Sequence, residues 1–318
     1  MTARKHIISI GECMMELRHR DDENLTLGFG GDTLNTALYI SRLGAASGLQ
    51  VSYLTALGDD VYSDRMIAAW KAEGIDTGLV ARLPGRLPGL YIIRTNAAGE
   101  RSFSYFRAAA AARDMLKDGR AEALQDQVAA AGCIYFSAIT LSILDDAQRR
   151  SLMAMLDDAR GHGAQVAFDS NYRPAGWHSV NDARQWMVQA WRRATIGLPT
   201  LDDEQKLYGD ATPEQCAARL RALGVAEVAV KMGEQGCYVS AGSTAKNVAA
   251  VSVPQPVDTT AAGDSFNAAY LAARLSGSNP LVAARKGNEL AAIVVQHPGA
   301  IIPRAAMADF HLGTGAPP

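Results

Sequence analysis

The fold class is decided by residues 132–169. The stretch opens with the apolar run GCIYFS at 132–137 and closes with AQVAFD at 164–169. Between the two runs, apolar residues recur at the three- and four-residue spacing of one helix face: Leu152, Met155, Leu156 and Ala159. Two buried strands joined by a helix predict a parallel strand pair with the helix packed on one face of the sheet.

The same alternation continues on both sides of this unit. We expect further strands at 5–10, 50–55, 194–198 and 226–231, and helices at 32–43, 62–73, 181–193, 213–223, 262–276 and 280–296. The helix at 32–43 should have Asp32 or Thr33 as its cap and end at Gly44. The sequence therefore predicts an α/β fold in which a mostly parallel sheet carries helices on both faces.

Two segments have the period of two that is typical of strands exposed on one face. GLYIIRT at 89–95 and RSFSYFR at 101–107, joined by residues 96–100, predict a β-hairpin. A second hairpin is expected near 236–248, and the alanine run at 108–112 suggests the start of a helix. We expect one domain over residues 1–318, in which about 13–30 and 86–108 form a small β lid.

Composition narrows the function. Of the 318 residues, 48% are hydrophobic and 20% charged, which is ordinary for a globular protein and excludes wholesale disorder. The net charge of -2 argues against general nucleic-acid binding, which needs a basic surface. No stretch approaches the roughly 20 apolar residues of a membrane helix. The four scattered cysteines suggest a reducing compartment, and we expect a cytoplasmic protein.

The common nucleotide-binding motifs are missing. A Walker A loop needs a Gly-Lys pair, which occurs nowhere in the chain. The first strand is followed only by Gly11, so the glycine fingerprint of a nicotinamide dehydrogenase is missing too. If the chain holds phosphates, it does so by other means.

Three motifs are candidates for a site. Residues 28–35, GFGGDTLN, combine glycines that let the backbone approach a ligand with Asp32 and Asn35, which suit vicinal hydroxyls. A glycine turn with an aspartate cap would explain this motif as well. Residues 168–174, FDSNYRP, follow the end of a strand, where ligands of open α/β sheets bind.

The third motif, DTTAAGDSF at 258–266, opens a helix. Small residues at a helix N-terminus point N–H groups and the positive end of the helix dipole outward, which makes an anion site. The carboxylate of Asp264 is favoured in that field and could accept a proton from an attacking hydroxyl. Phosphoryl transfer requires this combination of an anion site and a base. A simple cap with a small-residue turn is the alternative.

Together, GGDTLN near the start and DTTAAGD near residue 260 resemble the two signatures of the ribokinase-like carbohydrate kinases, or PfkB family. The resemblance spans nearly the whole chain. Three segments resemble the branch of that family that phosphorylates 2-keto-3-deoxygluconate, a sugar acid: residues 28–42, 86–107 and 171–174. The resemblance implies a three-layer ribokinase-like fold, ATP and Mg²⁺ as cofactors, and 2-keto-3-deoxy-6-phosphogluconate as the product.

The resemblance also implies a role for each matching residue. Asp264 becomes the general base, and the backbone of Ala261, Ala262 and Gly263 becomes the anion hole, with Ala261 at a position where many members have glycine. Gly31, Asp32 and Asn35 would contact the sugar hydroxyls. Tyr91, Tyr105 and Arg107 would contact the substrate from the lid. Asn171 and Arg173 would lie between substrate and phosphates. The nucleotide would be bordered by Lys231, Gly233 and Gly236, with the 297–300 loop near adenine or ribose.

The metal site is less complete. The family's N-x-x-E motif is not intact at residues 200–204, TLDDE, where Glu204 is the candidate magnesium ligand and the asparagine is missing. An exposed lid sheet often pairs with a partner's lid in this family, which implies a homo-oligomer, a dimer or higher. The expected partners are otherwise a small sugar acid and ATP, with no nucleic acid and no membrane.

Residue chemistry supports the sugar-acid branch separately. A guanidinium can clamp a substrate carboxylate through two parallel hydrogen bonds, and Arg107 and Arg173 are placed to do so. Two alternatives stay open: another sugar kinase of the family, such as a fructokinase, and a non-catalytic sugar-acid sensor. Asp264 speaks against the sensor, because binding alone needs no base.

Overall fold

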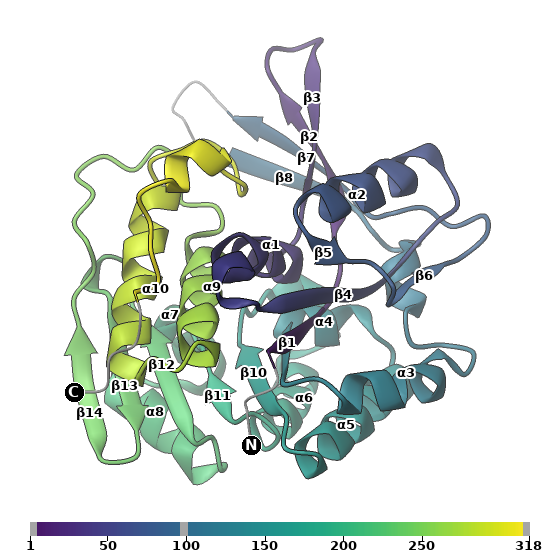
Figure 1. The fold of residues 1–318 in the computed structure, drawn as a ribbon. Coiled ribbons are helices and arrows are strands. Elements are labelled where there is room, and N and C mark those ends of the chain that lie inside the picture. The colour runs from purple at the N-terminus through teal and green to yellow at the C-terminus, as the bar shows by residue number, and fades with distance from the viewer. Residues whose placement is uncertain (1–4, 96–100, 314–318) are drawn as a thin grey trace.

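A ten-stranded sheet forms the centre of the molecule (Figure 1). The structure, a computed structural model, describes residues 5–95 and 101–313. The strand order is β14-β13-β12-β11-β10-β9-β1-β4-β5, with β6 also pairing with β4. The strands are β1 (His6–Ile10), β4 (Gln50–Leu57), β5 (Ile75–Asp76), β6 (Val80–Arg82), β9 (Cys133–Ser137), β10 (Gln165–Asp169), β11 (Ile196–Gly197), β12 (Glu227–Lys231), β13 (Cys237–Ala241) and β14 (Thr244–Val248). Pairing is parallel except at β13 and β14, which form the antiparallel edge.

Helices cover both faces of this sheet, because successive side chains of each central strand point to opposite sides. In β9, Cys133 and Tyr135 belong to one apolar cluster and Ile134 and Phe136 to the other. The first cluster is closed by α1 (Asp32–Gly44), α2 (Val61–Ala72), α9 (Ala262–Leu275) and α10 (Pro280–Val294). The second is closed by α3 (Arg120–Ala129), α4 (Ala138–Ile143), α5 (Asp146–Gly161), α6 (Val180–Trp191), α7 (Leu201–Tyr208) and α8 (Pro213–Ala222). The expected three-layer α/β fold is confirmed.

A second, four-stranded sheet stands off the body (Figure 1). Its order is β3 (Leu25–Gly30), β2 (Met14–His19), β7 (Leu90–Thr95) and β8 (Arg101–Phe106), with only β2 and β7 parallel. The chain passes between the body and this small sheet at residues 11–13, at Gly31, at 83–89 and at 107–110. The expected turn of the hairpin, at 96–100, lies outside the described residues.

Two local expectations were wrong. Helix α1 begins at Asp32, with Gly31 as its cap, and no side chain caps it. The Asp32 carboxylate is thereby left for contacts outside the helix. The alanine run at 108–112 does not start a long helix either. Ala110 forms a β-bridge with Leu87, and only a short 3₁₀ turn, Ala111–Asp114, follows, because the Ala111 N–H donates to Leu87 O at 2.9 Å.

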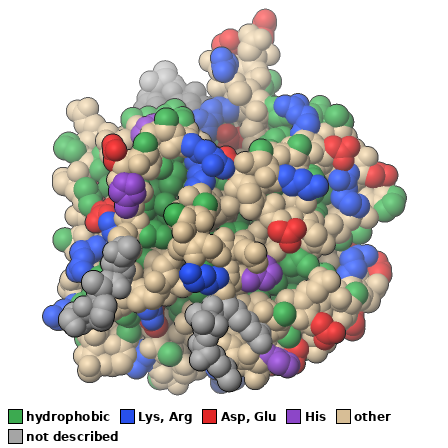
Figure 2. Space-filling model, in the orientation of Figure 1, with side chains coloured by type: hydrophobic (Ala, Val, Ile, Leu, Met, Phe, Trp, Pro, Cys, Tyr) green, Lys and Arg blue, Asp and Glu red, His purple; other side chains and the backbone are tan. Residues whose placement is uncertain are grey.

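The surface agrees with the near-neutral composition. On the face seen in Figure 2, acidic and basic side chains are interspersed, without a continuous basic field. Within residues 5–95 and 101–313, none of the helices combines the length and hydropathy that a membrane crossing requires.

Candidate active site

The three sequence motifs meet at one edge of the main sheet. Helix α1 brings Asp32 and Asn35, helix α9 brings Asp264, and the loop after β10 brings Asn171. Asn35 Nδ2 donates to Asp264 Oδ2 at 2.8 Å, and Asn171 Nδ2 donates to Asp32 Oδ2 at 2.7 Å. Residues more than 200 positions apart in the sequence are therefore in direct contact, at the carboxyl ends of the parallel strands.

Asp264 is poised to bind or release a proton near neutral pH. Burial raises the pKa of Asp264 to about 7, and the carboxylates of Asp32 and Asp169 act in the same direction. The hydrogen bond from Asn35 and the charge of Lys231 act against this shift. Burial thus outweighs the helix N-terminus, which would favour the carboxylate.

The loop before α9 has the geometry of an anion site. Ala261 has φ 61° and ψ 16°, a left-handed conformation that aims the following N–H groups along the start of the helix. Asp258 fixes the loop from below: its carboxylate accepts from the Thr260 N–H at 2.8 Å and from the Gly299 N–H at 2.9 Å. The Ala262 N–H donates to Thr259 O at 3.3 Å. Because a helix leaves its first N–H groups without intrahelical partners, the N–H groups of Gly263 and Asp264 can bind an anion here.

A buried cation lies under this loop. Lys231 Nζ donates to Asp169 Oδ2 at 2.9 Å and to Asn267 Oδ1 at 3.1 Å. A Cβ at Gly263 would lie 3.6 Å from the same Nζ atom. Lys231 therefore places positive charge against the anion site while Asp169 balances it.

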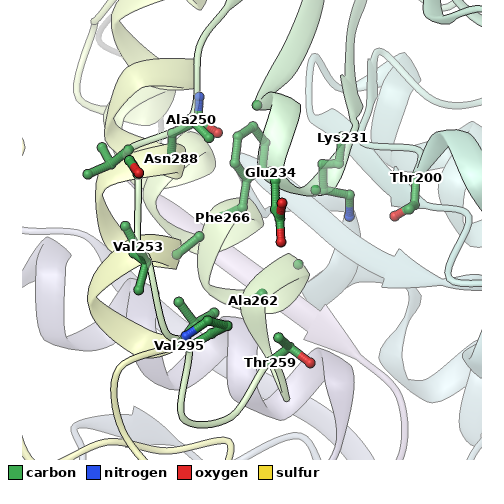
Figure 3. Close-up of a pocket in the computed structure, with 18 residues that line it drawn as sticks. Thr200, Lys231, Glu234, Ala250, Val253, Thr259, Ala262, Phe266, Asn288 and Val295 are labelled. Atoms are coloured by element: carbon green, nitrogen blue, oxygen red, sulfur yellow. The ribbon is translucent and has the colours of Figure 1, made fainter.

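A cavity of about 510 Å³ opens beside Lys231 (Figure 3). Its lining includes Lys231, Gly233 and Gly236, the expected nucleotide residues, together with Gly263 of the expected anion hole, and reaches Thr200. The rest of the lining is mostly apolar and was not anticipated: Ala250, Val251, Val253, Pro256, Phe266, Ala291, Ala292 and Val295. The 297–300 loop is not among the residues that line this cavity. Residues 298–301 line a separate hollow of about 500 Å³ beside the small sheet.

The expected lid residues lie together on the small sheet. The ring centroids of Tyr91 and Tyr105 are 5.9 Å apart, and Tyr91 OH donates to Glu16 Oε2 at 2.5 Å. Arg107 forms an ion pair with Glu12. Neither glutamate was singled out from the sequence. The sequence could have indicated both, because each is an acidic residue within the largely apolar N-terminal stretch IISIGECMMEL at 7–17.

Arg173 is more exposed than Arg107 and does not form as close an ion pair. Its side chain is 59% exposed, and its Nη1 lies 3.6 Å from Asp203 Oδ2. Asp203 itself is buried and accepts a hydrogen bond from the Tyr172 N–H at 3.2 Å. Burial raises the pKa of Asp203. The charge of Asp169 acts in the same direction, and the charges of Arg173 and Lys231 oppose it. Asp203 therefore belongs to the site, although the sequence did not single it out.

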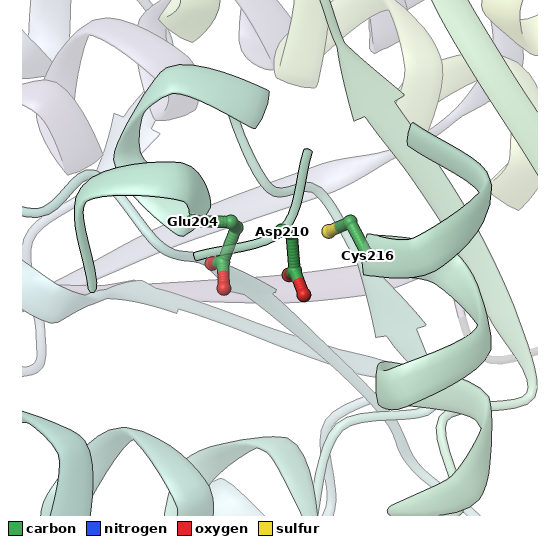
Figure 4. Close-up of side chains that lie close together, drawn as sticks. All are labelled: Glu204, Asp210 and Cys216. Carbon is green, nitrogen blue, oxygen red and sulfur yellow. The ribbon is translucent and has the colours of Figure 1, made fainter. Parts of the chain in front are cut away.

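Glu204, the expected magnesium ligand, forms a hydrogen bond with Ser170 of the loop after β10 and pairs with Arg219. It is fully buried in a cluster with Asp210 and Cys216 (Figure 4). Arg219 Nη2 lies 2.6 Å from a carboxylate oxygen of Glu204 and 2.6 Å from one of Asp210, so a cation already fills this cluster. Consecutive helix residues point about 100° apart, which separates Glu204 from Asp203.

Residues 4–307 match the family described as pfkB family carbohydrate kinase. The chain belongs to the PfkB family of carbohydrate kinases. It is 45% identical to a 2-dehydro-3-deoxygluconokinase of Dickeya dadantii over 95% of this chain and 98% of that one. It is 30% identical to fructokinase-1 of Oryza sativa over 76% of this chain and 72% of that one.

Solved structures agree with this PfkB fold. A ribokinase II from E. coli, in complex with ATP and Mg²⁺, matches with a TM-score of 0.79 over 93% of this chain and 94% of that one, at 22% identity. The protein is thus a carbohydrate kinase with the fold of kinases that bind ATP.

The left-handed Ala261 leads to a test. Ala261→Gly removes a conformational cost of about 1 kcal/mol, but glycine gives the unfolded chain more entropy worth about the same, so stability and kcat should stay close to the parent values. Ala261→Val places a β-branched residue where it is strongly disfavoured. It should cost about 1–3 kcal/mol of unfolding free energy and lower kcat. Thermal unfolding and steady-state rates measure both.

Ala222→Val, on an exposed position of α8, is the matched control and should cost only a few tenths of a kcal/mol. Equal effects at positions 261 and 222 would mean that the left-handed turn places no demand on the residue.

Proposed function

We propose that this kinase transfers the γ-phosphoryl group of ATP to the terminal hydroxyl of 2-keto-3-deoxygluconate, giving 2-keto-3-deoxy-6-phosphogluconate. One observation carries the proposal: the half-buried Asp264 carboxylate, beside a turn suited to an anion and held by Asn35 at 2.8 Å. The relatives that are 45% identical bear the name of this activity, which supports the choice of substrate.

Asp264 would act as the general base. Its raised pKa makes it a stronger proton acceptor than an exposed carboxylate, and the hydrogen bond from Asn35 fixes the direction of its Oδ2 lone pairs. The attacking hydroxyl loses its proton to Asp264 as its oxygen bonds to phosphorus. In the anion hole expected from Ala261, Ala262 and Gly263, the N–H groups of Gly263 and the adjoining Asp264 would stabilise the charge that builds up on the transferring phosphoryl oxygens.

The substrate would lie between the body and the small sheet. Gly31, Asp32 and Asn35 would contact its hydroxyls, and Tyr91 and Tyr105 would cover it. Arg107 would bind the carboxylate of the sugar acid, because a guanidinium suits a carboxylate better than any neutral group does. Arg173, which is more exposed, can approach from the phosphate side together with Asn171.

The nucleotide would occupy the cavity of about 510 Å³ (Figure 3). Its apolar wall suits a flat heterocycle, and Gly233 and Gly236 line the cavity beside Lys231. Its triphosphate would extend past Lys231 toward the turn at 261–263.

The residues present fit a magnesium ion. Mg²⁺ prefers oxygen ligands and is usually held by one or two carboxylates together with substrate phosphates. Asp203 offers such a carboxylate on the phosphate side, whereas Glu204 is engaged by Arg219. We assign Asp203, in place of Glu204, as the side chain that would hold Mg²⁺. The bound ion would offset the negative charge of the β- and γ-phosphates.

We also propose a cytoplasmic homo-oligomer, a dimer or higher. The register of the small sheet places Leu17, Leu27 and Ile92 side by side on one face. On this face Phe106 is 62% exposed and Leu25 42%. An apolar face of this kind suits pairing with a second copy. All four cysteines are free and buried, as expected in a reducing compartment.

A substrate panel tests the function. ADP release is followed with ATP and 2-keto-3-deoxygluconate, gluconate, fructose or ribose as acceptor. The sugar acid 2-keto-3-deoxygluconate should give the highest kcat/KM. A preference for fructose would overturn the substrate assignment and leave only the family. Binding of the sugar acid without turnover would favour the sensor.

Asp264→Asn tests the base. Asparagine has the size of aspartate but cannot accept the proton, so kcat should fall on the order of 10²–10⁴-fold while ATP and sugar still bind. Rapid-quench turnover and calorimetric titration measure the two effects. The exposed Asp202→Asn is the control for loss of one carboxylate and should keep the parental rate. A kcat within a few-fold of the parent for Asp264→Asn would remove Asp264 from this role.

Metal removal tests the magnesium assignment. EDTA should abolish turnover, and added Mg²⁺ should restore it. Asp203→Asn should raise the Mg²⁺ concentration that gives half-maximal rate, because it removes the charged ligand. Glu204→Gln should leave that concentration unchanged and instead lower the unfolding temperature, because it breaks the buried pair with Arg219. The reverse pattern would return the metal to Glu204.

A further inference from the structure

Glu12 is a buried carboxylate to which the proposed reaction gives no part. Its side chain is only 1% exposed, and it forms an ion pair with Arg107 through Oε2. Its other oxygen, Oε1, has no hydrogen-bond partner among the described residues. Burial raises the pKa of Glu12, and the nearby Asp32 adds to this, while Arg107 and Arg113 oppose it. A buried charge of this kind is costly to keep, so its arrangement calls for an explanation.

Glu12 lies where the chain passes between the body and the small sheet. It belongs to the first crossing, 11–13. At the second, a Cβ on Gly31 would lie 2.1 Å from Glu12 O. At the third, a Cβ on Gly89 would lie 2.7 Å from Glu12 Oε1. Arg107, its ion-pair partner, begins the fourth crossing. Two of these crossings thus have glycine where a side chain would displace Glu12.

The ion pair leaves part of the Arg107 guanidinium free. A guanidinium carries five N–H donors in a fixed fork. Nη2 is used by Glu12, whereas Nε, which has no partner among the described residues, is itself buried, so an incoming ligand would have to use the exposed end of the guanidinium. The Arg107 side chain is 24% exposed, so the group is held from the inside and is open on the other side. A second carboxylate can therefore bind without displacing the first.

We propose that Glu12 is a positioning residue, which holds Arg107 so that the open edge of its guanidinium receives the carboxylate of the sugar-acid substrate. The pair thereby sets the preference for a sugar acid over a neutral sugar. This inference rests on the proposed function, since it needs a substrate that carries a carboxylate.

The main test is Glu12→Gln, compared with Glu23→Gln, an exposed position in the turn between β2 and β3. Glu12→Gln should raise KM for 2-keto-3-deoxygluconate roughly ten- to a hundredfold, the usual effect of losing a charge-assisted contact. KM for ATP should stay within about twofold and kcat within a few-fold. Glu23→Gln should match the parent in all three.

Arg107→Leu should raise the same KM, and the double variant Glu12→Gln/Arg107→Leu should be no worse than Arg107→Leu alone, because Glu12 acts only through Arg107. The neutral ketose fructose should lose less kcat/KM in either variant. If the KM increases of the two single variants multiply in the double variant, Glu12 only supports the fold of the crossings. The same follows if kcat/KM falls equally for fructose and the sugar acid.

Gly89→Ala keeps every charge, but its Cβ would lie 2.7 Å from Glu12 Oε1 and 3.3 Å from Arg107 Cβ, so it disturbs the pair as a unit and should also raise KM for the sugar acid. A parent-like KM in both variants would overturn the inference. If the parent protein turns over fructose but not the sugar acid, the proposed function fails, and this inference fails with it. If the parent turns over the sugar acid and Glu12→Gln is unaffected, only this inference fails.

Discussion

Three aspartates meet at one edge of the main sheet, with Asp169 buried and Asp32 and Asp264 half-buried, and much of the structure serves to hold them there. Asp32 and Asp264 lie in the first turns of α1 and α9, and Asp169 ends β10. Like charges this close oppose ionisation, so each carboxylate needs donors. Asn171 serves Asp32, Asn35 serves Asp264, and Lys231 with Asn267 serves Asp169. Asp264 receives an amide hydrogen bond from Asn35, and burial together with the charges of Asp32 and Asp169 raises its pKa to about 7, so it can exchange a proton near neutral pH.

The layers of the fold position these groups. Parallel strands bring their carboxyl ends to one edge, and α1 and α9 pack side by side with many small residues, so that their N-termini open toward the same space. Tyr135 and Thr36 link the two helices to the sheet: Thr36 Oγ1 donates to Asp264 O at 3.2 Å, and Asn267 Nδ2 donates to Tyr135 OH at 3.1 Å. The crossings between the body and the small sheet contribute a charged pair of their own, Glu12 with Arg107.

How much of this could be predicted depended on whether a local pattern or a distant partner decides the outcome. The apolar runs at 132–137 and 164–169, with a helical pattern between them, were enough to predict the fold class, because the burial of such runs follows from their own composition. The motifs at 28–35, 168–174 and 258–266 located the site, because turns rich in glycine and alanine at helix starts carry their own geometry. Asp203 and Glu204 are adjacent acids, and only the position of Arg219, fifteen residues later, decides which of them turns away from the site. The role of Glu12 could not be predicted either, because it depends on a partner, Arg107, that is 95 residues away in the sequence.

The central claim is that burial among like charges makes Asp264 the proton acceptor. The most direct measurement is the pH dependence of kcat/KM for the parent and for Asp32→Asn, because kcat/KM follows the ionisation of the free enzyme. Asp264 works only when deprotonated, so activity should fall as pH drops through the raised pKa of about 7. Asp32→Asn removes a like charge, so the acidic limb should move to lower pH, whatever the variant does to the absolute rate. An acidic limb that stays in place in Asp32→Asn, or a parent profile that is flat through pH 7, would contradict the account.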